Sequence, residues 1–202
     1  MVFPPLFLLI LSYWAAGQVP IPTPQKEPSG QGERGPILTI QGSGEESNGK
    51  TFTSASGGFS IDIGQLPTKT RDLTEPSARA RGVDAGKQYL WTLEKGIFTL
   101  LYSGAVDSYG NAIPVTFAEM ENGSRKGILR ANAKLISEKP IKFGKYRGTE
   151  FRYLSADGIH FIGRIFLVGD VIYQLAGSYT DEKDEKHVLD VLQSFKLLKQ
   201  QR

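Results

Sequence analysis

Hydrophobic and polar residues alternate in the segment "GGFSIDIGQLP", residues 57–67. Phe59, Ile61 and Ile63 are separated by single polar residues, and a period of two is typical of a strand with one buried face. The alternation therefore predicts a strand that begins near residue 59. The polar, arginine-bearing segment that follows, 68–86, is predicted to be a loop.

Short turn sequences divide the later apolar segments into antiparallel hairpins. The turn signals are the dipeptides Lys95-Gly96, Asp157-Gly158 and Gly169-Asp170. Two-residue turns of this composition favour tight pairing of the strands on either side. Across the first turn, we expect Trp91 on the same face as Phe98 and Tyr102. The other two turns predict a meander of three strands, over 147–156, 159–168 and 171–178.

The predicted strand 159–168 is apolar on both faces, with Arg164 as its charged residue. Both faces of such a strand need cover, so we expect helices on both sides of the sheet. One helical pattern covers 114–131. The second covers 180–195, where Thr180 or Asp181 is the expected cap. The sequence therefore predicts an α+β fold, with a mainly antiparallel sheet covered by helices on both faces.

The N-terminal part of the chain predicts export followed by a tether. Residues 1–17, "MVFPPLFLLILSYWAAG", are predicted to be a cleaved signal peptide, because their apolar core is shorter than the roughly 20 residues that cross a bilayer. They contain no Lys or Arg, so an uncleaved interfacial anchor and a misassigned start codon stay open. Residues 18–50, rich in proline and glycine, are predicted to be a disordered linker, and 51–199 the folded domain. The expected location is extracytoplasmic, periplasmic or secreted.

Composition limits the chemistry that the chain can perform. Its formal net charge of +3 over 202 residues is too small to indicate nucleic-acid binding. The chain has no cysteine, which excludes disulfides, thiolate nucleophiles and zinc–cysteine sites. Only two histidines are present, so the chain has few histidine ligands for a metal site. We predict no metal and no cofactor.

Four segments resemble the PsbP-like superfamily in sequence and order. They are "GGFSIDI", "KFGKYRGTEFRYL", "GRIFLVGDVIYQLAG" and "VLQSFKLL". The superfamily includes extrinsic photosystem proteins, a Ran-binding nuclear-import factor and uncharacterised exported bacterial domains, to which this chain is most similar. The resemblance spans about 51–199 and implies an α/β/α sandwich with a non-enzymatic accessory or binding role. The metal-associated residues of the photosystem members have no match here, so an oxygen-evolving role is not implied.

Arg164 is the first candidate site residue, because an unpaired charge inside an apolar strand is costly. With the tight turn predicted above, the register places Arg164 opposite Phe151 and Leu175, and it places Glu150 on the other face. Arg164 and His160 would then form an anion-binding site on one face. The alternatives are a structural ion pair, or a residue at the rim whose stem covers apolar surface.

Two further candidate sites come from a strand and a loop. Glu150 and Gln174 are expected to flank Ile165. There they would either line a pocket or form hydrogen bonds with the polar groups at the end of a loop or helix. Tyr109 and Asn111 lie in the glycine-containing loop "DSYGNAIP", and aromatic residues in loops are suited to binding.

Basic residues gather around one predicted strand and turn. They are Lys139, Lys142, Lys145 and Arg147. They are suited to binding anionic lipid or an acidic partner. Lysines on an edge strand also discourage aggregation, which is the alternative explanation for them.

No catalytic motif accompanies these candidates. The sequence contains neither a nucleophile elbow nor a phosphate-binding glycine loop, and we predict that the protein is not an enzyme. We expect a monomeric binding module that docks on a protein partner at the cell envelope, with peripheral membrane association as a variant of this role. The alternative is a carrier of a small hydrophobic or anionic ligand held between the sheet and the helix at 114–131, which requires a cavity of about 300 Å³.

Overall fold

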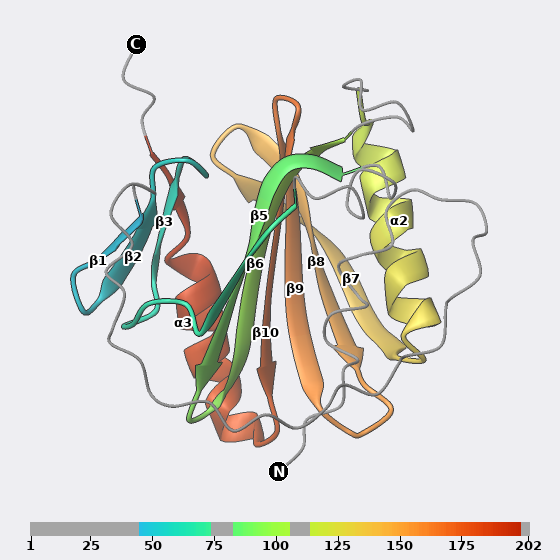
Figure 1. Cartoon of the computed structure of the whole chain (residues 1–202). Helices are drawn as coiled ribbons and strands as arrows, with labels where there is room; N and C mark the ends of the chain where they lie inside the picture. Colours follow the sequence, from blue (N-terminus) through green and yellow to red (C-terminus); the bar gives the residue numbers. More distant parts are fainter. Residues whose placement is uncertain (1–44, 74–82, 106–113, 199–202) are drawn as a thin grey trace, which may run out of the picture.

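The computed structural model describes residues 45–73, 83–105 and 114–198 of the chain. The predicted signal peptide, most of the predicted linker, and the loop with Tyr109 and Asn111 lie outside these ranges. Within them the chain forms two sheets and two α-helices, which are shown in Figure 1.

The larger sheet has seven strands in the order β4-β5-β6-β10-β9-β8-β7. All neighbouring strands in it pair antiparallel, so the prediction of a mainly antiparallel sheet is confirmed. In chain order these strands are β4 (Lys69–Asp72), β5 (Val83–Leu93), β6 (Gly96–Ala105), β7 (Lys134–Phe143), β8 (Tyr146–Leu154), β9 (His160–Val168) and β10 (Val171–Tyr179).

The smaller sheet joins the two ends of the described chain. Its strands lie in the order β1-β2-β3-β11. They are β1 (Glu45–Ser47), β2 (Thr51–Ser54), β3 (Phe59–Asp62) and β11 (Lys196–Leu197). The strand predicted from the alternating pattern near residue 59 is confirmed as β3, with Phe59 and Ile61 buried.

Two strands form in segments for which the sequence predicted no regular structure. β1 lies inside the predicted linker 18–50, and β4 lies inside the predicted loop 68–86. Both are short and polar, and both stand at the edge of a sheet. Because their side chains are mostly exposed or half-buried, their residues show no apolar alternation that would reveal a strand.

The smaller sheet and α3 (Glu185–Gln193) cover one face of the larger sheet, hereafter the α3 side. The rings of Phe52 and Phe59 pack edge-on against Tyr89, with centroids 5.2 and 5.6 Å apart. A short 3-10 helix, η2 (Glu182–Asp184), capped by Asp181, leads into α3. The buried residues of α3 are Val188, Val191 and Leu192.

The helix α2 (Phe117–Arg130) packs on the opposite face, hereafter the α2 side, against β7 and β8. Thr116 and Glu119 form a capping box, in which each side chain accepts a hydrogen bond from the backbone N–H of the other. Met120 and Ile128 are buried among side chains of β8 and β9.

The cover of the larger sheet differs from the prediction of helices on both faces. On the α3 side, the smaller sheet and α3 together cover the larger sheet. On the α2 side, the helix packs mainly at the β8–β7 end of the sheet (Figure 1). The inner strand β9 is nevertheless buried on both sides as predicted, because Phe161 and Ile165 pack under α2 while Ile162 and Phe166 pack on the α3 side.

Candidate functional site

Glu150 of β8 and Arg164 of β9 form an ion pair on the α3 side of the larger sheet. They are direct cross-strand partners, and both Nε and Nη2 of Arg164 lie 2.9 Å from Oε2 of Glu150. Glu150 is 1% exposed and the side chain of Arg164 is 12% exposed. Hydrogen bonds between two ionised groups are among the strong ones, but here they offset the cost of removing both charges from water.

The predicted register placed Glu150 on the wrong face of the sheet. It assumed a two-residue turn, whereas the five residues Ser155–Ile159 join β8 to β9, and Leu154 pairs with His160. Ser155 organises this longer loop. Its backbone N–H donates to the carbonyl oxygen of Ile159, and its hydroxyl oxygen accepts from the backbone N–H of Ile159.

The longer loop shifts the pairing of β8 and β9 by one residue, and a one-residue shift exchanges the faces of a strand. Arg164 lies opposite Leu175 of β10, as predicted, but not opposite Phe151. Thr149, and not Glu150, flanks Ile165 together with Gln174. The expectation that Glu150 and Gln174 flank Ile165 together is therefore wrong, and the two side chains lie on opposite faces of the sheet.

Three further charged residues extend the ion pair. Lys139 Nζ lies 3.0 Å from Oε1 of Glu150, and Arg152 Nε lies 3.5 Å from the same oxygen. Arg152 Nη1 lies 2.6 Å from Oε1 of Glu185, at the start of α3. The network thus connects β7, β8, β9 and α3, and its three bases and two acids leave one positive charge in excess.

The sequence contained a signal for part of this network. Gly144-Lys145 is a two-residue turn between Phe143 and Tyr146, and this register places Lys139 opposite Glu150. The predicted hairpins did not include this turn, so the contact between Lys139 and Glu150 was not predicted. The contact of Arg152 with α3 depends on tertiary packing, and no local pattern predicts it.

The two carboxyl groups of the network are held ionised. Burial raises the pKa of Glu150, but the cations Lys139 and Arg164 outweigh burial and hold that pKa below its ordinary value of 4.5. The hydrogen bond from Arg152 lowers the pKa of Glu185. At neutral pH both groups are therefore fixed charges, and neither is suited to transfer a proton.

The structure brings His160 to Tyr179 rather than to Arg164. The two rings stack with centroids 5.2 Å apart, and the hydroxyl of Tyr179 donates to Glu185 Oε2 at 3.2 Å. His160 shares a face with Arg164 but lies four residues away along β9. Of the predicted site residues, Arg164 and Glu150 are thus in contact, and His160 adjoins the other end of the network.

A groove of about 260 Å³ opens between β7 and α3, beside Arg164. Its lining residues are Ile141, Lys142, Phe143, Arg164, Phe166, Leu192, Gln193 and Phe195. The ring of Phe143 bridges β7 to the others, with centroids 5.2 Å from Phe166 and 5.3 Å from Phe195. Five of these eight residues are aromatic or aliphatic, and Lys142, Arg164 and Gln193 are the polar ones.

The cavity between the sheet and α2 is much smaller. It measures about 40 Å³ and is lined by residues that include Ile128, Phe151 and Gln174, whereas small-molecule pockets begin near 300 Å³. Polar contacts hold α2 down, since Arg125 Nε donates to Glu138 Oε2 at 2.8 Å. The space predicted for a carried ligand is therefore too small.

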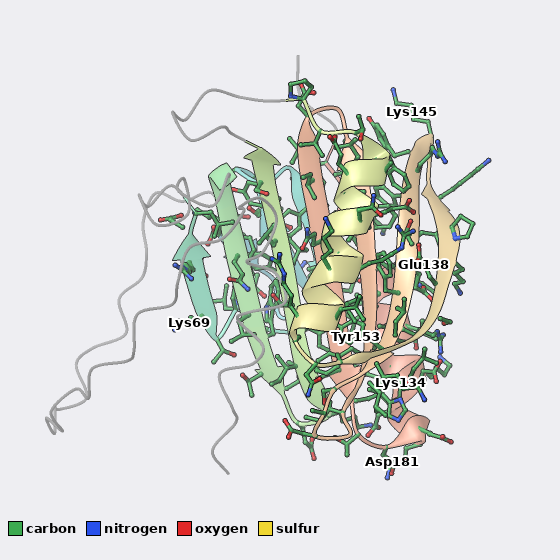
Figure 2. All side chains as sticks on the ribbon, turned by 90° about the vertical axis from the view of Figure 1, so that its right-hand side faces the viewer. Lys69, Lys134, Glu138, Lys145, Tyr153 and Asp181 are labelled. Atoms are coloured by element: carbon green, nitrogen blue, oxygen red, sulfur yellow. The ribbon has the colours of Figure 1, made fainter. Side chains whose placement is uncertain are left out.

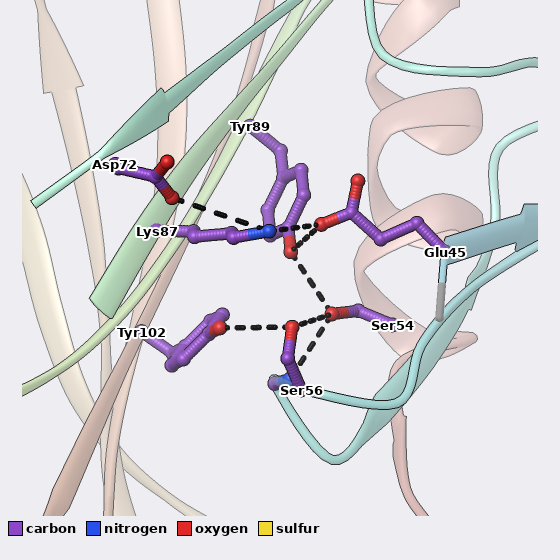
Figure 3. A network of polar contacts seen from close by, with 8 residues as sticks. Glu45, Ser54, Ser56, Asp72, Lys87, Tyr89 and Tyr102 are labelled. Atoms are coloured by element: carbon purple, nitrogen blue, oxygen red, sulfur yellow. Dashed lines mark hydrogen bonds and ion pairs between the residues drawn. The ribbon is translucent and has the colours of Figure 1, made fainter. Parts of the chain in front are cut away.

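A second polar network holds the smaller sheet against the larger one (Figure 3). Glu45 of β1 accepts from Lys87 Nζ at 2.9 Å and from the hydroxyl of Tyr89 at 2.8 Å. The Tyr89 hydroxyl also lies 2.9 Å from Ser54 Oγ. Burial raises the pKa of Tyr89, which disfavours the phenolate, so this network is suited to anchoring β1 and not to acid–base chemistry.

Basic side chains follow the outer edge of the larger sheet. We define the basic hairpin as Lys134, Lys139, Lys142, Lys145 and Arg147, which lie on β7, on β8 and in the turn between them. Figure 2 shows β7 beside α2, with Lys134 towards one end and Lys145 at the other. Glu138 is the acidic residue of the segment 134–147, and Arg125 pairs with it.

The described ranges contain no cluster of His, Asp and Glu that could hold a metal ion. Neither α2 nor any other helix in the same ranges is long and apolar enough to cross a bilayer.

These features define an α+β domain with a buried charge network. No protein-family model matches the chain, and no curated protein matches it. Among solved structures, it is similar in fold to the cyanobacterial PsbP protein (CyanoP) of Synechocystis sp. PCC 6803. The two share 14% identity with a TM-score of 0.49, over 81% of this chain and 98% of that one.

A second similar structure is a protein of Bacteroides thetaiotaomicron VPI-5482, at 14% identity and a TM-score of 0.38, over 77% of this chain and 51% of that one. At this identity the likeness concerns the fold alone, and it does not identify a ligand or a partner.

Proposed function

We propose that this chain is an exported, monomeric and non-enzymatic binding module that docks on an acidic protein partner at the cell envelope. The observation that carries the proposal is the positive charge of the basic hairpin. The signal peptide expected at 1–17 supports export. The ionised, paired state of Glu150 and Glu185 supports a non-enzymatic role, because neither carboxyl group is free for general acid or base work.

The charge of the chain is concentrated in this hairpin. Residues 134–147 carry five basic side chains and one acid, a net charge of +4, whereas the whole chain carries +3. Lys134, Lys142 and Lys145 are exposed and make no ion pair with any residue of the described part. Clustered charges of one sign accelerate association with a complementary surface and select against like-charged partners.

The hairpin is suited to contact through side chains and not through strand addition. β7 is an edge strand, but Pro140 lacks an N–H donor and a bulge interrupts the pairing between Leu135 and Ser137. Both features block the addition of a further strand. Ile136, at the bulge, is 52% exposed, and it supplies an apolar contact among the lysines, as protein interfaces commonly require.

The test compares the full chain with two charge-reversal variants. Lys134→Glu/Lys145→Glu changes the basic hairpin, and Lys50→Glu/Lys69→Glu makes the same change of charge on exposed residues elsewhere. Each protein is crosslinked in its own envelope fraction, and the affinity of any captured protein is then measured with purified components at several salt concentrations. Sedimentation with phosphatidylglycerol vesicles is measured in parallel.

We expect the hairpin variant to bind the captured partner at least about tenfold more weakly, the control variant to bind like the wild type, and added salt to weaken binding. Equal loss in both variants, or binding that is insensitive to salt, would contradict docking through the hairpin. Capture by vesicles alone would replace the protein partner with an anionic membrane surface. Recovery of the chain in the cytoplasmic fraction would contradict export.

A further inference from the structure

We propose that the groove beside Arg164 binds a small carboxylic acid with a compact apolar body. The groove lies on the α3 side of the sheet, between β7 and α3. Lys142 of the basic hairpin borders it, but Lys142 pairs with Arg147, which lies over the Phe117 ring of α2. Strand alternation therefore directs the Lys142 side chain to the α2 side, away from the groove. Lys139 of the same hairpin contacts Glu150, the partner of Arg164, so the two proposals are separated through Lys134 and Lys145, which do not line the groove.

The body of the ligand would meet three aromatic rings. Phe143, Phe166 and Phe195 line the groove from three different segments, and their rings lie 5.2 to 6.3 Å apart. Leu192 and Ile141 complete the apolar lining. Phe166 and Phe195 are almost completely buried, whereas Phe143 is half-buried and keeps part of its ring accessible. An accessible aromatic ring favours an additional ring in an edge-on or offset arrangement, so a ligand with one phenyl-sized group fits this lining.

The carboxylate would meet the guanidinium of Arg164. Nε and Nη2 are directed at Glu150, while Nη1 makes no hydrogen bond with any part of the chain that the structure describes. A guanidinium has five N–H donors, so Arg164 keeps donors for a second carboxylate while it remains paired. Gln193, which is exposed at the same groove, adds an amide that could donate as well.

The surrounding charge favours an anion over a neutral or cationic ligand. Arg164 belongs to the network of three bases and two acids described above, which has one positive charge in excess. A bound carboxylate would balance this excess. The volume of about 260 Å³ lies just below the usual range of ligand pockets, so it limits the body to roughly one ring and excludes a long acyl chain.

The test uses 3-phenylpropionate as the probe and its neutral amide, 3-phenylpropanamide, as the matched control ligand. Binding to the full chain is followed by amide chemical shifts in NMR spectra and by titration calorimetry. Arg164→Lys keeps a cation opposite Glu150 but removes the planar fork. Lys145→Gln removes one positive charge from the basic hairpin and leaves the groove intact.

We expect saturable shifts centred on Phe143, Phe166 and residues 192–195, with a dissociation constant below about 1 mM for the acid. The amide should bind about tenfold more weakly, Arg164→Lys should weaken the acid at least about fivefold, and Lys145→Gln should leave it unchanged. Equal affinity for acid and amide, shifts centred elsewhere, or no saturation by 10 mM of probe (roughly ten times the expected constant) would overturn the proposal. Each of these results is independent of whether the hairpin variant loses its protein partner.

Discussion

Arg164 directs two nitrogens to one oxygen of Glu150, and this leaves the other carboxylate oxygen to Lys139 and Arg152. Glu150 is thus the common partner of three cations that come from three different strands. Because it is almost completely buried, its charge is tolerated only while these partners remain. The residue is a structural centre of the sheet, and this dependence can be measured.

Removal of either partner of the central pair should be costly. Glu150→Leu leaves a largely buried guanidinium without its main partner, and Arg164→Met leaves a buried carboxylate. Each should lower the free energy of unfolding by roughly 3 kcal/mol, as measured by urea denaturation. The double variant should lose clearly less than the sum of the two, because it replaces a buried ion pair with apolar side chains of similar size.

The exposed pair Lys186–Asp190 is the matched control for this cycle, since its side chains are 83% and 57% exposed. Its double-mutant cycle should give a coupling below about 0.5 kcal/mol. A coupling at Glu150–Arg164 that is as small as this would show that the buried pair does not stabilise the sheet.

The same network should make the stability dependent on pH in the acid range. The pKa values of Glu150 and Glu185 are lowered in the folded chain, so their contribution is present above the unfolded value of 4.5 and is lost as the pH falls through the folded values. The free energy of unfolding should therefore fall below about pH 4.5. The Glu150→Leu/Arg164→Met variant should show a shallower fall. Identical slopes in the two proteins would contradict the assignment to Glu150.

The anchoring of β1 gives a third prediction. Tyr89→Phe removes the hydroxyl that joins Ser54 to Glu45, and it should cost about 1–2 kcal/mol because buried polar groups lose a partner. Backbone amides of 45–54 should also exchange faster with solvent. Tyr146→Phe is the control, since its hydroxyl makes no hydrogen bond in the described ranges, and it should change stability little. Unchanged exchange in the Tyr89 variant would show that the network does not hold β1.

Apolar patterning predicted the strands and helices that bury a face. The meander, α2 and α3 were predicted close to their observed bounds, because each has buried residues at the spacing of its element. β1 and β4 were missed, because edge strands with exposed side chains need no apolar pattern. Their pairing depends on neighbours that are distant in sequence.

The candidate site was harder to predict than the fold, because it depends on register. Arg164 was identified from the apolar strand around it, but its partner Glu150 was assigned to the wrong face, because the pairing of β8 with β9 is shifted by one residue from the predicted register. The two-residue turn predicted at Gly169-Asp170 is confirmed, because Val168 pairs with Val171. The loop after β8 differs because Ser155 supplies its own hydrogen bonds to Ile159, which a turn dipeptide does not reveal.

The last prediction concerns two glycines on neighbouring strands. At Gly148, a Cβ atom would lie 2.4 Å from the ring of Phe166 and 2.7 Å from the carbonyl oxygen of Ile165, whereas at Gly163 the nearest atoms would be 3.7 Å away. Gly148→Ala must therefore displace Phe166 or the backbone, and it should cost about 1–3 kcal/mol, as overpacking does. Gly163→Ala should be neutral or slightly stabilising, because alanine restricts the unfolded chain.

These two variants also separate the groove from the general stability of the sheet. Phe166 lines the groove, so its displacement in Gly148→Ala should shift the NMR signals of Phe143 and Phe195, whose rings pack near it. Gly163 faces the small cavity on the α2 side, so Gly163→Ala should leave these signals in place. Equal stability of the two variants, measured by urea denaturation, would show that Phe166 does not depend on the missing side chain at position 148.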